Sequence, residues 1–181
     1  MNRTAWLLDR LIELSGPLGP FTTPQQREQQ HEHFLAGLDE STLDPLIGIL
    51  VRPSPEVPND AYREHFELEL QEAIVAAGRN CPLVALNKIA PLLEDAVARP
   101  VAIDVIGALR LREGIPLLER QSEHEPSTAD EWARIACALG DIGGTAADIV
   151  LARMQSHPQA RAPEIAEAIL IARMRCESSK G

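Results

Sequence analysis

The chain contains few aromatic residues. Its 181 residues include two tryptophans, one tyrosine and three phenylalanines. All-β folds favour aromatic and β-branched residues, so this scarcity argues against them. A core with so little aromatic volume must be built from aliphatic and small side chains, and small side chains allow helices to approach one another closely.

Long apolar runs and paired cysteines are also lacking. Asp9, Arg10 and Glu13 interrupt the apolar residues of segment 1–15, whereas a secretory signal needs ~7–15 uninterrupted apolar residues and a membrane span about 20. The segment instead predicts an amphipathic helix. The three cysteines lie far apart in the sequence, which is typical of buried thiols in a reducing compartment. We therefore expect a cytoplasmic protein without a membrane anchor.

Basic residues are outnumbered. There are 17 of them against 27 acidic residues, and the formal net charge is −10. None of the segments 1–60, 61–125 and 126–181 has a net positive charge, so no segment offers a basic surface for a phosphate backbone. Nucleic acid is thus a disfavoured partner. Usage rich in alanine and arginine and poor in lysine favours a bacterial source.

The composition changes near residue 60. Alanine is rare before that point and frequent after it, and half of the 14 prolines lie in the first sixty residues. We expect residues 1–60 to form a helical cap or a divergent repeat. Thr23, Pro24 and Gln26 predict a helix start with a capping box, and Thr42 with Pro45 predicts a second start.

From residue 61 to 177 apolar residues recur at helical spacing, and no segment alternates with period two. Short breaks separate helices of ~10–17 residues, which predicts an all-α fold. Thr145 and Asp148 resemble a capping box at the start of one of these helices. Residues 178–181 are expected to form a flexible tail.

An internal repeat appears when the sequence is shifted by 33 residues. Ile106-Gly107 then falls on Leu139-Gly140, Gly114 on Ala147, and Leu118 on Leu151. The matches lie at the end of one helix, the turn and the start of the next helix. A fixed period of this kind is typical of stacked helix pairs.

The turn sequence Ala138-Leu139-Gly140-Asp141-Ile142-Gly143-Gly144 resembles the turn of a HEAT-like repeat, the variety also found in phycobilin lyases. Gly140 and Gly143 are expected to let the chain leave one helix in a left-handed conformation. Ile106-Gly107-Ala108-Leu109 resembles the same motif.

The resemblance implies a short right-handed α-solenoid of stacked antiparallel helix pairs over residues 61–177. In such an array the concave surface, lined by the second helix of each pair, binds a partner. The scaffold does not determine the function, because it serves adaptors, regulators, inhibitors and lyase subunits that hold a tetrapyrrole.

No catalytic constellation is evident. His31 and His33 are two residues apart, so on a helix they point to different sides and cannot chelate one ion together. His65, His124 and His157 have polar or acidic neighbours near predicted helix ends and are interpreted as surface residues. We therefore assign no catalytic, cofactor-binding or metal-binding residue. Trp132 lies on an apolar stripe and is predicted to pack in the core.

Clusters of charge offer the remaining candidates for contact with a partner. Acidic residues crowd the segment after Asp60, where a solvated helix face is the simpler interpretation and a cation or a basic partner is the alternative. Arginines near the repeat turns suit either surface solubility or contact with an anion or acidic peptide. The candidate partner-binding residues are Glu64, Glu67, Arg110, Arg112, Arg120 and Arg153.

Together these features favour a protein-binding module without catalytic activity, whose partner is a protein; the sharper form of this expectation is a basic protein. A tetrapyrrole-binding or other small-ligand subunit of the lyase type is the alternative, and nucleic-acid binding is the weakest. The oligomeric state is left open.

Overall fold

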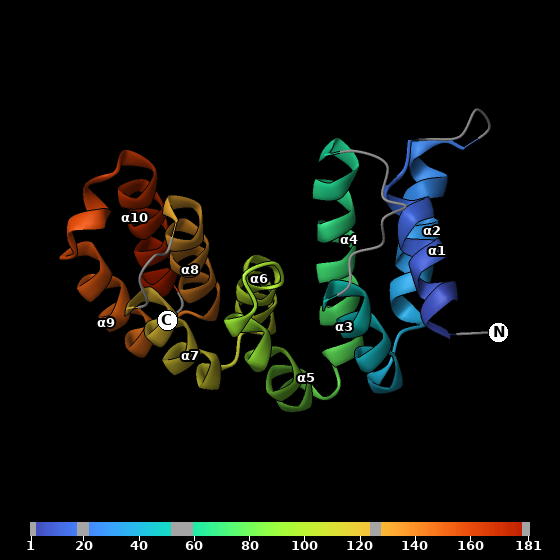
Figure 1. Cartoon of the computed structure of the whole chain (residues 1–181). Helices are drawn as coiled ribbons and strands as arrows, with labels where there is room; N and C mark the ends of the chain where they lie inside the picture. Colours follow the sequence, from blue (N-terminus) through green and yellow to red (C-terminus); the bar gives the residue numbers. More distant parts are fainter. Residues whose placement is uncertain (1–2, 18–21, 52–59, 124–127, 179–181) are drawn as a thin grey trace. The chain divides into compact units, whose positions relative to one another are not determined.

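The computed structural model describes residues 3–17, 22–51, 60–123 and 128–178 (Figure 1). This part of the chain contains α-helices and short 3-10 helices and no strand, which confirms the prediction of an all-α protein. The predicted proline-rich loop at residues 53–58, His124 and residues 179–181 of the predicted tail lie outside the described residues. The chain divides into two compact units, Met1–Lys88 and Ile89–Gly181, called here the N-terminal and C-terminal units.

In the N-terminal unit, α1 packs on α3 and α4, and α2 packs on α4. Aliphatic side chains fill the core between these helices, and among them Leu7, Leu11 and Leu70 are essentially inaccessible to solvent. The elements are α1 (Arg3–Ser15), α2 (Pro24–Ala36), η1 (Glu40–Thr42), α3 (Leu43–Val51), α4 (Asp60–Gly78) and α5 (Pro82–Ile89). The composition break near residue 60 therefore falls inside this unit, because α4 contacts α1, α2 and α3.

Both predicted helix starts in this unit are present, but only one uses the expected cap. The Thr23 side chain accepts a hydrogen bond from the backbone N–H of Gln26, and the Gln26 side chain accepts one from the backbone N–H of Thr23. Thr42 does not cap α3. It closes a capping box whose N-cap is Asp39, at the start of η1. Because η1 runs directly into α3, the cap lies three residues earlier, and the Asp39 side chain provides it.

The C-terminal unit has two layers of helices (Figure 1). In the first layer α8 packs between α6 and α10, and in the second α7 contacts α9 while both contact α8. The elements are η2 (Ala90–Glu94), α6 (Arg99–Leu109), η3 (Arg112–Gly114), α7 (Ile115–Glu123), α8 (Ala129–Ile142), α9 (Gly144–Gln155), η4 (Pro158–Arg161) and α10 (Pro163–Ser178).

Glycines bring the helices of the first layer close together. A Cβ atom added to Gly107 in α6 would lie 2.7 Å from Cα of Ala138 in α8. A Cβ added to Gly140 in α8 would lie 2.8 Å from Cα of Ala172 in α10. Both distances are too short for a real Cβ, so each helix crossing depends on glycine against alanine.

One of the two predicted turn glycines, Gly140, does not lie in the turn. Gly143 has a positive φ of 73° and ends α8, as expected, but Gly140 lies within α8 and serves helix packing rather than the turn. In the preceding turn Arg110 ends α6 with φ 54° and is the only non-glycine residue with positive φ among the described residues.

The predicted capping box of Thr145 and Asp148 is wrong. No side chain caps the start of α9, whose N-cap is Gly143. Asp148 instead accepts a hydrogen bond of 2.9 Å from Nε of Arg173 in α10. The tertiary ion pair with the neighbouring helix replaces the local cap.

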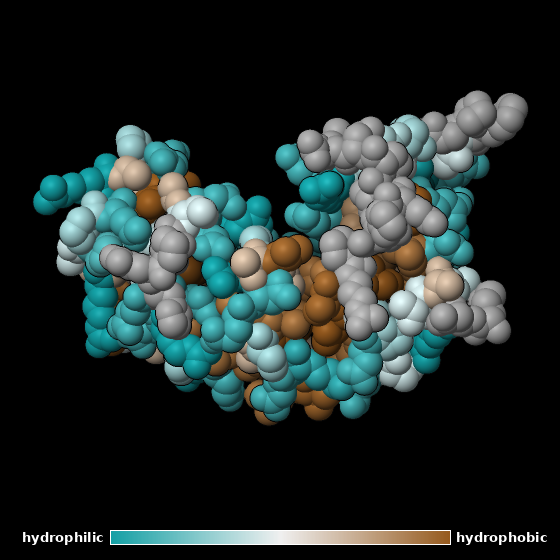
Figure 2. Space-filling view, in the orientation of Figure 1, coloured by the Kyte–Doolittle hydropathy of each residue, from teal (hydrophilic) through white to brown (hydrophobic). Residues whose placement is uncertain are grey.

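The visible surface is mainly hydrophilic (Figure 2). Some large apolar side chains nevertheless remain exposed, including Leu170 and Met174 on α10. Over the described ranges, none of the helices combines the length and the apolar character that crossing a membrane requires.

Candidate functional site

Three potential ligand groups converge between α2 and α4 in the N-terminal unit. His31 comes from α2, whereas Glu69 and Glu72 come from α4, where their spacing of three residues places them on one face. Nε2 of His31 lies 3.0 Å from Oε2 of Glu69 and 3.0 Å from Oε2 of Glu72. We call these residues the His–Glu–Glu cluster. It is the one group of this type found among the described residues.

The cluster is partly buried. The side chains of His31, Glu69 and Glu72 expose 22%, 20% and 42% of their surface. Burial raises the pKa of the Glu69 carboxyl, with His31 opposing this shift and Glu72 adding to it. Nε2 of His31 and Oε2 of Glu69 are inaccessible to solvent, yet neither has a hydrogen-bond partner among the residues that the structure describes. The two atoms therefore lie close together without an aligned hydrogen bond.

Apolar packing contributes little to the position of α2. Phe34 is its only buried residue, and its ring lies 6.1 Å from that of Trp6. Arg27 adds a polar anchor, because its guanidinium donates to the carbonyls at the end of α1. These acceptors are Glu13, Leu14, Gly16 and Pro17. His31 thus lies on a helix whose position depends mainly on polar contacts.

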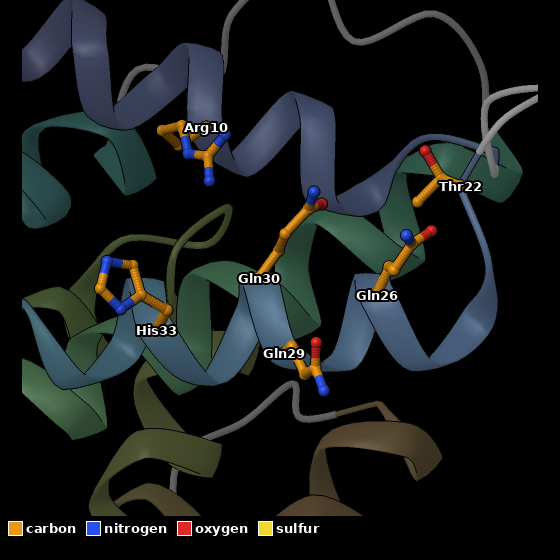
Figure 3. Close-up of a pocket in the computed structure, with 6 residues that line it drawn as sticks. All are labelled: Arg10, Thr22, Gln26, Gln29, Gln30 and His33. Carbon is orange, nitrogen blue, oxygen red and sulfur yellow. The ribbon is translucent and has the colours of Figure 1, made fainter.

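A polar pocket of about 400 Å³ lies between α1 and α2 (Figure 3). Arg10 and Gln30 extend toward the space between the helices, whereas Gln29 points away from it. His33 also lines this pocket, so His31 and His33 do point to different sides of α2, as predicted. Arg10 pairs with Glu13 on its own helix. The pocket offers amide and hydroxyl groups, but it holds no buried charge for a specific ligand.

A second cavity, of about 340 Å³, lies in the C-terminal unit and is called here the α7–α9 cavity. It combines acidic, apolar and aromatic side chains. Its lining residues are Glu119, Ser122, Glu123, Trp132, Val150, Arg153, Met154 and His157. Glu119 forms an ion pair with Arg153, whereas Glu123 has no ion pair among the described residues.

Trp132 is the most unusual part of the α7–α9 cavity. It is only 2% exposed, which confirms its predicted place in the core, and it also lines the cavity. Its ring centroid lies 4.9 Å from that of His157. The buried indole Nε1 has no acceptor within the described part of the chain. A buried N–H without a partner costs ~1–3 kcal/mol, so an acceptor supplied by a ligand would be favoured here.

The residues predicted to bind a partner do not form one site. Glu64 is exposed and Glu67 half-buried on α4, and neither belongs to the His–Glu–Glu cluster. Arg110 and Arg112 are exposed in the turn after α6. A partner-binding role for these four residues stays a prediction.

The other two predicted arginines bind glutamates of a preceding helix. Arg120 in α7 lies 3.0 Å from Glu94 in η2, and Arg153 in α9 pairs with Glu119 in α7. Arg153 lines the α7–α9 cavity, together with the acidic Glu119 and the aromatic Trp132. For Arg120 and Arg153, too, contact with a partner stays a prediction.

Sequence reasoning missed the His–Glu–Glu cluster. The spacing of Glu69 and Glu72 was visible, but their third partner lies 38 residues before Glu69 on another helix. Only the packing of α2 on α4 brings His31 to them. One imidazole nitrogen and two carboxylate oxygens form a ligand set suited to a divalent transition metal ion.

In comparisons with known proteins, no family model, no curated protein and no solved structure matches this chain.

Proposed function

We propose that the chain is a protein-binding module of the HEAT-like type that acts by binding rather than by catalysis. Three pairs of positions that differ by 33 residues support a repeated unit in its C-terminal half. They are the packed glycines 107 and 140, the positive-φ residues 110 and 143, and the ion-paired arginines 120 and 153. A right-handed α-solenoid is the architecture that such repeated helix pairs form.

The partner in this proposal is a protein with an exposed basic segment. The α7–α9 cavity is the observation that carries this choice. It lies on α7 and α9, the helices that would line the concave face of a HEAT-like array. Glu123 supplies a negative charge that no described cation neutralises, and Nε1 of Trp132 supplies a buried donor.

A basic peptide satisfies both groups together. A backbone carbonyl of the peptide would accept the hydrogen bond from Trp132, while an arginine or lysine side chain would pair with Glu123. The aliphatic part of that side chain would pack on Val150 and Met154. The net charge of −10 would also speed the approach of a basic partner.

Selection from a random peptide library on the immobilised protein tests this proposal. We expect the enriched peptides to be rich in arginine and lysine, and the enrichment to be lost in Glu123→Gln. Glu164→Gln, which removes the same charge from an exposed position at the start of α10, should leave the enrichment unchanged. No enrichment, enrichment of neutral or acidic peptides, or equal results for the two variants would refute the proposal.

Tryptophan fluorescence then locates the bound peptide. The chain has two tryptophans, so Trp6→Phe leaves Trp132 as the only one. An enriched peptide should change the Trp132 emission, and its affinity should fall as salt is added. A peptide that binds without changing this emission would place the binding surface elsewhere.

A further inference from the structure

The distances within the His–Glu–Glu cluster match the edges of a metal coordination shell. A transition metal ion lies about 2.1 Å from nitrogen and oxygen ligands. Two such ligands at a right angle are then about 3.0 Å apart, by the same bond lengths. Both carboxylate oxygens lie 3.0 Å from Nε2 of His31. The three ligand atoms all lie within 4.8 Å of one another.

Contacts within the cluster do not satisfy its buried atoms. Nε2 of His31 faces two carboxylate oxygens, but neither lies in line with a ring N–H, and Nε2 and Oε2 of Glu69 are both closed to solvent. Buried polar atoms in proteins nearly always have a partner. A divalent ion bound to all three residues would satisfy both atoms and would offset the repulsion between the two carboxylates.

A metal ion bound by the cluster would link two helices. The cluster joins α2 to α4, and α2 has only Phe34 buried against the rest of the unit. An ion held by His31 from one helix and by Glu69 and Glu72 from the other would link them directly. The charge of Arg27 acts on Glu69 and weakens the attraction for a cation, although its guanidinium is bound to the carbonyls that end α1.

We propose that His31, Glu69 and Glu72 bind a divalent transition metal ion that fastens α2 to α4. The imidazole ligand favours Zn²⁺ over Mg²⁺ and Ca²⁺, which prefer oxygen ligands alone, and Mn²⁺ should bind the same site more weakly than Zn²⁺. Three protein ligands leave further coordination positions for water. This proposal is independent of peptide binding by the C-terminal unit.

Zinc titration by calorimetry tests it on the full chain. Cys81→Ser and Cys137→Ser form the background, because these are the two thiols that reach the surface. We expect one zinc ion per chain and a rise in melting temperature on zinc addition. His31→Gln should lower the affinity at least about tenfold, since loss of even an outer-shell partner costs ~10–100-fold. His33→Gln, on the same helix but outside the cluster, is the matched control.

Two outcomes would overturn the proposal. One is the absence of saturable zinc binding in the background protein, and the other is equal affinity in the His31→Gln and His33→Gln variants. If His31→Gln does not fold, Glu72→Gln replaces it, because Glu72 is the most exposed member of the cluster.

Paramagnetic Mn²⁺ gives a test that needs no substitution. It should broaden the ring signals of His31 before those of His33 and His157. Broadening in the reverse order, or of all histidines alike, would also overturn the proposal.

Discussion

In the C-terminal unit, a glycine of one helix lies against an alanine of the next where α8 crosses α6 and α10. In the N-terminal unit, by contrast, mainly polar side chains hold α2 to its neighbours. The first kind of contact brings two backbones together and leaves no space for a methyl group. The second kind depends on a guanidinium, an imidazole and two carboxylates whose positions can adjust.

The same residue type therefore has different consequences in the two units. Gly107 and Gly140 are buried at helix crossings, whereas nothing lies within 4 Å of a Cβ added to Gly48 in α3. The repeat seen in the sequence corresponds to the close crossings of the C-terminal unit. In the N-terminal unit the polar contacts occupy positions where other chemistry, such as metal binding, becomes possible.

The largest expected effect is that of Gly140→Ala. The new methyl group would lie 2.8 Å from the backbone of Ala172, so α8 and α10 would have to move apart. Overpacking of this kind costs about 1–3 kcal/mol, and the gain in helix propensity offsets only part of it. Urea denaturation should show a loss of about 2 kcal/mol in unfolding free energy. Unchanged or increased stability would mean that this crossing is looser than the structure indicates.

Arg27→Gln tests the polar anchoring of the N-terminal unit. Arg27 donates to four carbonyls after or near the end of α1, and glutamine cannot reach them all. Hydrogen bonds from charged groups contribute about 1.5–3 kcal/mol, and partial exposure of this side chain reduces that, so we expect a loss of about 1 kcal/mol. Arg79→Gln, at an exposed position after α4, serves as the control. Equal effects of the two changes would contradict the anchoring role.

Much of the C-terminal unit could be predicted from sequence. The helical spacing of apolar residues identified the helices, and the 33-residue shift aligned Gly107 with Gly140. The role of Gly140 was nevertheless wrong, because a glycine near a helix end suits a turn as well as a close crossing. The predicted cap by Asp148 was wrong for a related reason, because the same side chain can either cap α9 or pair with Arg173, and it pairs with Arg173.

The His–Glu–Glu cluster could not be predicted in the same way. Helical periodicity shows which face of α4 is buried, but it does not show which helix covers that face. α2 has almost no apolar stripe, so its sequence gave no signal for the direction in which His31 points. The α7–α9 cavity was also missed, because a core position for Trp132 does not reveal that its indole N–H lacks an acceptor in the described part of the chain.

Arg110→Gly should stabilise the C-terminal unit. Arg110 ends α6 with φ 54°, a conformation that costs a residue with a side chain roughly 1–2 kcal/mol relative to its usual one. Glycine adopts it readily but loses more entropy on folding, which leaves an expected gain of about 1 kcal/mol. Thermal and urea unfolding would measure this gain. A loss of stability would show that the exposed arginine makes contacts worth more than the backbone strain.

Gly48→Ala should give the smallest effect, and its sign completes the comparison with Gly140→Ala. Gly48 is exposed within α3, and a Cβ at this position meets no atom within 4 Å. The substitution therefore adds helix propensity and reduces the entropy of the unfolded chain without a steric cost, so we expect a gain of about 0.5 kcal/mol. The two variants make the same chemical change in two helices, and urea denaturation of both under one set of conditions isolates the effect of the neighbouring backbone. If both lower stability by the same amount, the difference between the units does not lie in how closely their helices approach, because a methyl group in open space would then cost as much as one pressed against Ala172.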